Sequence, residues 1–188
     1  SLILGCIGSA NAYNTESSSL QEPDNVLYYI EVQSEQEYQD LVTEIDAHNE
    51  RAQALWAKAL EEGTEAPVSS PISTYSYTKS DDVPIYVGKA GVLKKYLYAY
   101  ITFDQVTAAG GYPMFGGFYD FNVYSQSDTV SVSGVDYEKG KYLDSGRTLP
   151  VNVSGVVGIK STSSSSWNYK SFTSYIEFYA SGVGHCYD

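Results

Sequence analysis

The tyrosines are the residues whose type and spacing in this sequence could support binding chemistry. The chain contains 19 tyrosines against 6 phenylalanines. On two predicted strands they alternate with apolar residues, and alternate residues of a strand point to the same face of a sheet. Each of these strands therefore has an apolar core side and an opposite side that carries tyrosine. The candidate ligand-binding residues are Tyr96, Tyr98, Tyr100, Tyr175 and Tyr179.

The tyrosine rows have two interpretations. Exposed rings stack on the apolar faces of sugars and also make good contacts with proteins. In the structural interpretation, the rings only pack across neighbouring strands or lie under a helix, and no ligand is needed. If the two strands are neighbours and a helix lies on the opposite side, the five rings form one platform. We expect its partner to be a glycan or an extracellular protein.

Catalytic groupings are missing from the sequence. His185 and Cys186 are adjacent, so in an extended chain their side chains point to opposite sides and make a poor dyad. No Gly-x-Ser-x-Gly motif occurs. The carboxylates considered for a glycosidase pair, which nothing in the sequence brings together, are Glu31, Glu138, Asp144 and Glu177. The sequence therefore predicts no catalytic residue and no cofactor, and it favours a protein that is not an enzyme.

Metal-binding patterns are also missing. Asp81-Asp82 and Asp120-Phe121-Asn122 lack the spacing of a calcium-binding loop. His48 has no second histidine or carboxylate pair at a metal-ligand spacing. We therefore predict no metal site and expect His48 at the solvent edge of a helix.

The charge of the chain excludes one class of partner. The formal net charge is −12, from 11 Lys+Arg against 23 Asp+Glu. Phosphate backbones and anionic membranes repel such a surface, so we expect no nucleic-acid partner. A hydrophobic content of 43% and a mean hydropathy of −0.26 are typical of a folded chain. No apolar run after Ala12 is long enough to span a bilayer, so no membrane span is predicted.

The first twelve residues have the pattern of the end of an export signal. A short apolar stretch runs into Ala10-Asn11-Ala12, the small-x-small pattern of a signal-peptidase site. We expect residues 1–12 to be a signal remnant, the exported chain to start at Tyr13, and the protein to be extracellular or on a bacterial cell surface. The alternatives are a buried strand or helix, or lipidation of Cys6. If residues 1–12 are retained, Cys6 could instead form a bridge with Cys186.

An amphipathic helix is the clearest predicted element. It follows a predicted strand, Val26–Val32, which is rich in β-branched and aromatic residues. Ser34 and Glu37 form a capping box at its start. Apolar residues then recur at steps of three and four as far as Leu60, and Gly63 ends the helix. A single apolar stripe predicts that the helix packs on one partner surface.

The rest of the chain predicts an antiparallel β domain. Residues 64–71 form a Pro/Ser linker, and glycine- or serine-rich turns separate the strands that follow. Between two strands, Tyr112–Tyr119 is predicted to be an aromatic loop that either makes contacts or tucks into the domain. The predicted strands are Ile72–Thr78, Ile85–Val87, Leu93–Phe103, Phe118–Ser125, Thr129–Ser133, Thr148–Lys160 and Lys170–Ala180.

The predicted fold class is α+β, with a long N-terminal amphipathic helix packed on an antiparallel β-sandwich and a small β-barrel as the alternative. Residues 13–63 hold the first strand and the helix, residues 72–188 hold the β domain, and the two parts form one compact unit. We expect a secreted or surface-attached, non-catalytic binding or adhesion module. The first alternative is a secreted polysaccharide-directed hydrolase, which a tyrosine-lined groove with two facing carboxylates would favour. The second is a β-pore-forming or purely structural extracellular protein.

Overall fold

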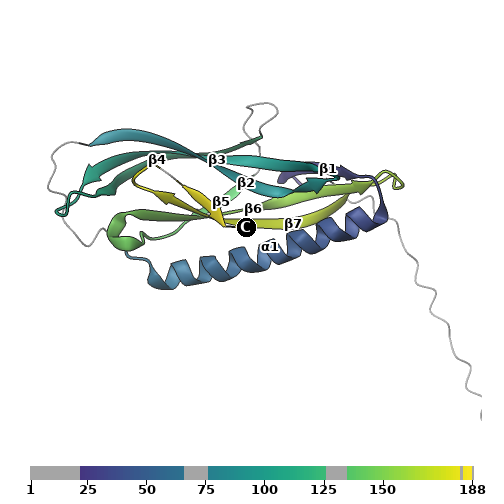
Figure 1. Cartoon of the computed structure of the whole chain (residues 1–188), viewed down its shortest axis with the longest axis horizontal. Coiled ribbons are helices and arrows are strands. Elements are labelled where there is room, and N and C mark those ends of the chain that lie inside the picture. The colour runs from purple at the N-terminus through teal and green to yellow at the C-terminus, as the bar shows by residue number, and fades with distance from the viewer. Residues whose placement is uncertain (1–21, 66–75, 126–134, 183, 188) are drawn as a thin grey trace, which may run out of the picture.

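The computed structural model describes residues 22–65, 76–125, 135–182 and 184–187 (Figure 1). The predicted signal remnant with Cys6, most of the linker and the predicted strand Thr129–Ser133 lie outside these residues. The elements in chain order are β1 (Val26–Val32), α1 (Glu35–Glu62), β2 (Tyr77–Ala90), β3 (Leu93–Thr107), β4 (Pro113–Ser125), β5 (Asp136–Lys139), the 3-10 helix η1 (Asp144–Gly146), β6 (Thr148–Ser161), β7 (Asn168–Tyr179) and β8 (His185–Tyr187).

Two sheets form the body of the protein. One has the strand order β1-β6-β7-β8, with β5 also pairing with β6, and the other has the order β2-β3-β4. The sheets lie face to face, and buried residues from both form one hydrophobic core, including Ile101 and Phe103 from β3 and Ile176 and Phe178 from β7. Figure 1 shows α1 on the side of the first sheet that faces away from β2-β3-β4. The α+β sandwich-like prediction is confirmed, and the described strands do not close into a barrel.

The predicted antiparallel domain, residues 72–188, is antiparallel in all its described strand pairs, but the N-terminal strand β1 joins it in the other direction. β1 pairs with β6 in parallel, whereas every other described pair is antiparallel. Parallel pairing needs a long connection between the two strands. That connection here contains α1 and the whole β2-β3-β4 sheet. Sequence patterns reveal a strand but not the direction of its partner, so this pairing could not be anticipated.

The ends of α1 are those that the sequence predicts. The Ser34 hydroxyl accepts a hydrogen bond from the Glu37 backbone N–H at 3.2 Å, and Gly63 is the C-cap. The Glu37 carboxylate reaches back to the backbone N–H of Gln33 at 2.8 Å. The helix contacts β7, β6 and β2. Among the described residues, no helix is both long enough and apolar enough to cross a bilayer.

The apolar stripe of α1 ends at Ala59, one residue before the predicted Leu60. Leu41 and Ile45 are buried, whereas Leu60 is 47% exposed. In the second half of the helix the buried positions are Ala52 and Ala59. Leu55 and Trp56 in this half are partly buried and pack against the cluster that Ala52 and Ala59 form with Tyr175.

The predicted aromatic loop Tyr112–Tyr119 is mostly strand. β4 begins at Pro113, and Met114 and Phe115 are buried in the protein. The glycines that suggest a turn instead mark an irregularity in the pairing of β4 with β3. Asp104 is opposite Gly117, but the next residue, Gln105, is opposite Phe115, so one residue of β4 is skipped. An extra residue in one strand is a β-bulge, a position where glycine is common.

Other strand boundaries also differ from the prediction. The predicted segment Ile85–Val87 is the middle of the 14-residue strand β2, and only the last residues of Ile72–Thr78 lie in the described part of the chain. Sequence analysis missed β5 and β8, which have four and three residues. Strands this short hold too few residues to show an alternating pattern.

Candidate functional site

The five predicted site tyrosines do not form one platform. Tyr96, Tyr98 and Tyr100 lie on β3, whereas Tyr175 and Tyr179 lie on β7, and these strands belong to different sheets. The shared platform required the two strands to be neighbours. That condition is not met, because each tyrosine row points outward from its own sheet and the hydrophobic core separates the two rows.

Tyr175 is a core residue beneath α1. Its side chain is only 2% exposed, and it packs with the helix residues Ala52 and Ala59. Its ring centroid lies 6.5 Å from that of Trp56. A ring in this position cannot stack on a large ligand unless the helix moves away. The helix covers Tyr175 of the predicted residues. We call Tyr175 and Tyr179 on β7 the covered group, and Tyr96, Tyr98 and Tyr100 on β3 the open group.

A single carboxylate organises the covered group. Glu177 accepts hydrogen bonds from the Tyr175 hydroxyl at 2.8 Å and from the Tyr179 and Tyr187 hydroxyls at 2.9 Å each. We call these four residues the Glu177 cluster. Tyr187 comes from β8, which the sequence analysis missed, although the i, i+2 spacing of Tyr175, Glu177 and Tyr179 on one strand face is visible in the sequence.

The Glu177 cluster holds its phenol protons tightly. Burial, and then the hydrogen bond to Glu177, raise the pKa of Tyr175 above its ordinary value. Burial, and then hydrogen bonds to Tyr187 and Glu177, raise the pKa of Tyr179. For Tyr187 the hydrogen bond with Tyr179 lowers the pKa, but burial and Glu177 outweigh it and the net shift is upward. The phenols therefore stay neutral hydrogen-bond donors at physiological pH.

The open group belongs to a larger aromatic surface on β2-β3-β4. We call this surface the tyrosine face, and its members are Tyr86, Tyr96, Tyr98, Tyr100 and Tyr124. Two ring pairs follow the strand register. Tyr98 stacks on Tyr124 with centroids 5.5 Å apart and planes 19° apart, and Tyr86 lies 5.7 Å from Tyr96. All five side chains are half-buried, and α1 borders this surface at its Tyr86–Tyr96 end.

Polar groups lie between the rings of the tyrosine face. The Tyr124 hydroxyl donates to the Asp82 carboxylate at 2.8 Å, and the Tyr100 hydroxyl donates to the Ser80 hydroxyl at 2.8 Å. Burial and the hydrogen bond to Asp82 raise the pKa of Tyr124 to about 12. Asp82 and Asp120 are exposed on the same side of the sheet. Aromatic rings beside free carboxylate oxygens can hold a ligand that has both apolar faces and hydroxyl groups.

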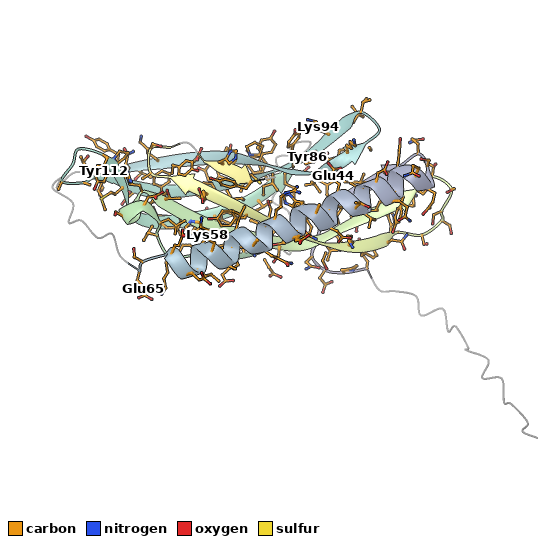
Figure 2. The ribbon with its side chains drawn as sticks, turned by 60° about the horizontal axis from the view of Figure 1, so that its bottom comes forward. Glu44, Lys58, Glu65, Tyr86, Lys94 and Tyr112 are labelled. Carbon is orange, nitrogen blue, oxygen red and sulfur yellow. The ribbon has the colours of Figure 1, made fainter. Side chains whose placement is uncertain are left out.

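A pocket adjoins the tyrosine face where α1 meets the β2-β3 hairpin. Its volume is about 330 Å³. Tyr86 and Tyr96 belong both to this pocket and to the tyrosine face, and the Tyr86 hydroxyl donates to Glu44 of the helix at 2.9 Å. Figure 2 shows Glu44, Tyr86 and Lys94 gathered at this end of the molecule. We call it the hairpin pocket. The remaining charged residues that line it are Arg51 and Lys89.

His48 lies at the floor of the hairpin pocket and not at a solvent edge. It is 4% exposed, and its ring stacks on Phe172 with centroids 5.1 Å apart and planes 7° apart. The prediction of a solvent-edge position is therefore wrong. The helix turns this residue toward the sandwich edge, one turn after Ile45, so its ring completes the core.

Two further pockets flank the Glu177 cluster. One, of about 220 Å³, is lined by Glu177, Tyr175 and Tyr187 together with Glu62 from the end of α1. The other, of about 420 Å³, is lined by residues that include Tyr112, Asp144, Arg147 and Tyr179. In the second pocket the Arg147 guanidinium lies 5.0 Å from the centroid of the Tyr112 ring, and Asp144 accepts a hydrogen bond from Thr148.

His185 and Cys186 point in opposite directions, as their adjacency on a strand requires. His185 is exposed and makes an edge contact with Tyr187, whereas Cys186 is buried with its Sγ atom 3.1 Å from the Ser174 hydroxyl. Across the described ranges, no group of three or more His, Cys, Asp or Glu residues could hold a metal ion.

Comparisons with protein-family models, with curated protein sequences and with solved structures found no match to this chain. The function must therefore be inferred from the geometry of its own surfaces.

Proposed function

We propose that this protein is a secreted or cell-surface module that binds a glycan through the tyrosine face without catalysing a reaction. The observation that carries the proposal is the stacked pair Tyr98–Tyr124, which lies on an outward sheet surface with Asp82 hydrogen-bonded at its edge. The two rings offer apolar surface for a sugar, and the carboxylate offers acceptors for its hydroxyl groups.

The spacing of the rings favours a chain of sugars as the ligand. Tyr96, Tyr98 and Tyr100 repeat every second residue on β3, so the row extends for ~14 Å at a rise of ~3.4 Å per residue. Several weak stacking contacts along such a row add up to a useful affinity only when the ligand is a linked chain.

The chemistry of the tyrosine face favours a glycan over a protein. The centres of protein interfaces are depleted of charged residues. Here Asp82 is opposite Tyr100 and accepts the Tyr124 hydroxyl, and Asp120 is opposite Thr102, the next position of the row. Carboxylates in that position would be costly to bury against a protein surface, but they can accept hydrogen bonds from sugar hydroxyls that remain partly hydrated.

Replacing Tyr98 with alanine tests this proposal. We expect Tyr98→Ala and Tyr124→Ala each to weaken glycan binding by about tenfold or more, because each removes one ring of the stacked pair. Binding should be measured by calorimetry on a glycan selected from an array, and melting temperatures should be recorded for every variant.

Tyr77→Ala is the matched control. Tyr77 is an exposed tyrosine of the same sheet, at the start of β2, and its position in the alternating pattern puts it on the side opposite Tyr86. Its replacement should leave binding unchanged. Failure of the wild-type protein to bind any glycan, or a Tyr98→Ala variant that binds as the wild type does, would contradict the proposal.

A hydrolase is the second candidate, supported by the pocket that contains both Glu62 and Glu177 with two tyrosines. We place it second because the Glu177 oxygens already accept three phenol hydrogen bonds. We expect the wild-type protein to release no reducing ends from a panel of polysaccharides. Release that disappears in Glu177→Gln would replace the binding proposal with the hydrolase.

A further inference from the structure

The hairpin pocket concentrates positive charge in an acidic protein. The chain has only 11 Lys+Arg residues. Three of them, Arg51, Lys89 and Lys94, line this one pocket. They come from the middle of α1 and from the two strands of the β2-β3 hairpin, on both sides of the turn. No other described pocket is lined by more than one of the basic residues.

These three cations have no carboxylate partner among the residues that the structure describes. Four other basic residues form ion pairs in the described part of the chain, and they are Lys58, Lys141, Lys160 and Lys170. Arg51, Lys89 and Lys94 form no ion pair with a described residue. Glu44 is the sole carboxylate that lines the pocket, and one of its oxygens accepts the Tyr86 hydroxyl. The pocket therefore has an excess of positive charge.

We infer that the glycan bound by the tyrosine face carries an anionic group, a carboxylate or a sulfate ester, and that this group binds in the hairpin pocket. The inference rests on the proposed function and adds the chemical class of the ligand. Arg51 can pair with such a group through two parallel N–H donors, and Lys89 and Lys94 can approach it as point charges.

The position of the pocket fits an anionic sugar at one end of the tyrosine row. Tyr86 and Tyr96 form the boundary between the pocket and the tyrosine face. A sugar stacked on this pair would have its neighbours on the row toward Tyr98 and Tyr100. The buried side chains of Ile45 and His48 close the inner end of the pocket, so a bound anion would be partly shielded from water. Shielding strengthens its attraction to the cations.

The negative charge around the hairpin pocket would determine where an anionic glycan lies on the tyrosine face. Asp82, Asp104 and Asp120 lie along the tyrosine face, and the whole chain has a net charge of −12. An anionic group on the ligand would be repelled along most of the face. The hairpin pocket is the place on this surface where an anion is attracted, so the charged sugar would fix the position of the chain on the tyrosine face.

The test compares oligosaccharides that differ in charge. The probes are cellotetraose, xylotetraose, tetragalacturonate, the fully methyl-esterified form of tetragalacturonate, and a sulfated carrageenan tetrasaccharide. We expect at least one anionic probe to bind about tenfold or more tightly than the neutral probes, the factor that corresponds to one charge-assisted hydrogen bond. Added salt should weaken the binding of that probe. The tighter of the two anionic probes identifies the group as carboxylate or sulfate.

Charge-removing variants locate the contact. Arg51→Gln and Lys94→Gln should each reduce the preference for the anionic probe and leave the affinity for a neutral probe unchanged. Both side chains are exposed, so the fold should tolerate the replacements. Lys58→Gln, which removes a charge at the other end of the same helix, should have no effect (Figure 2).

The outcomes separate this inference from the proposed function. Equal binding of charged and neutral probes, or a preference that survives Arg51→Gln and Lys94→Gln, would overturn the inference and leave glycan binding intact. Anionic binding that depends on Arg51 but not on Tyr98 would overturn the role of the tyrosine face and keep the pocket. Binding of none of the probes would overturn both.

Discussion

Leu41→Ala is expected to lower the free energy of unfolding by about 2–5 kcal/mol, the range for deleting a buried leucine side chain. Leu41 is one of the largest fully buried side chains and belongs to the main core. It lies over Gly88 of β2, so closely that a Cβ atom at Gly88 would be 2.4 Å from Leu41 Cδ1. Urea unfolding of the wild type and the variant measures the change.

Gly88→Ala should be destabilising for two separable reasons. Gly88 has a φ of +153°, a conformation that costs other residues about 1–3 kcal/mol. The added methyl group would also clash with Leu41, and overpacking of this kind costs about 1–3 kcal/mol. Only the clash depends on Leu41.

The double variant Leu41→Ala/Gly88→Ala isolates the clash. We expect it to be more stable than the sum of the single variants predicts, by about 1–3 kcal/mol, because the shortened residue 41 leaves room for the new methyl group. Leu60→Ala, at an exposed position of the same helix, should change stability by less than about 0.5 kcal/mol. Additive single effects would show that Leu41 does not pack on Gly88.

The parts of the fold that sequence predicted well are those that local interactions determine. The start of α1 depends on Ser34 and Glu37, and its end on Gly63, all within a few residues of the helix. β1 has the predicted bounds, Val26–Val32, because its run of β-branched and aromatic residues is interrupted on both sides. Such features can be read from a short window of the chain.

The pairing of strands could not be predicted. Alternation of apolar and polar residues shows which side chains share a face of a strand, but not which element packs on that face. Tyr98 on β3 and Tyr175 on β7 have the same sequence context, with tyrosine on one side and apolar residues on the other. One is in a half-buried surface row and the other is in the core beneath α1. The difference arises from the placement of one helix, which only the assembled structure shows.

The hairpin pocket was beyond sequence reasoning for a similar reason. Arg51 is separated from Lys89 and Lys94 by a strand, a linker and a turn, so no spacing rule connects the three. His48 was misplaced because its burial depends on Phe172, more than a hundred residues later in the chain. A site whose residues come from distant segments can be identified only from the folded structure, in which the helix packs against the edge of the sandwich.

The same residue type therefore has two roles in this protein. On β2-β3-β4 the hydroxyls of Tyr100 and Tyr124 bond to side chains at the surface, and both side chains are half-buried. In the Glu177 cluster the phenols converge on one carboxylate beneath the helix. The first group can change partners when a ligand arrives, whereas the second group holds β7 and β8 together. Alkaline titration should separate the two roles.

The stability of the protein is expected to fall steeply above a pH of about 10, the ordinary pKa of tyrosine. Below that pH both the folded and the unfolded chain hold the phenol protons, so the three phenols add no pH dependence to the free energy of unfolding. Above it the unfolded chain loses these protons, whereas the raised pKa values of Tyr175, Tyr179 and Tyr187 keep them bound in the folded chain. Each retained proton lowers the free energy of unfolding by about 1.4 kcal/mol per pH unit.

Tyr175→Phe and Glu177→Gln test the origin of this dependence. Phenylalanine has no proton to lose, so Tyr175→Phe should make the decline shallower by about 1.4 kcal/mol per pH unit. Glu177→Gln removes the negative charge that helps to raise all three pKa values. This variant should be less stable at neutral pH by about 1–3 kcal/mol, through lost charge-assisted hydrogen bonds, yet lose less stability as the pH rises.

Tyr77→Phe supplies the control for the alkaline titration, because Tyr77 is exposed and outside the cluster. Because the Tyr77 side chain makes no contact with Glu177 in this cluster, its replacement should leave the slope equal to that of the wild type. Denaturant unfolding at a series of alkaline pH values gives all the slopes. Identical slopes for the wild type, Tyr175→Phe and Glu177→Gln would mean that the three phenols ionise freely in the folded protein. The hydrogen bonds to Glu177 would then contribute nothing to holding β7 and β8 together.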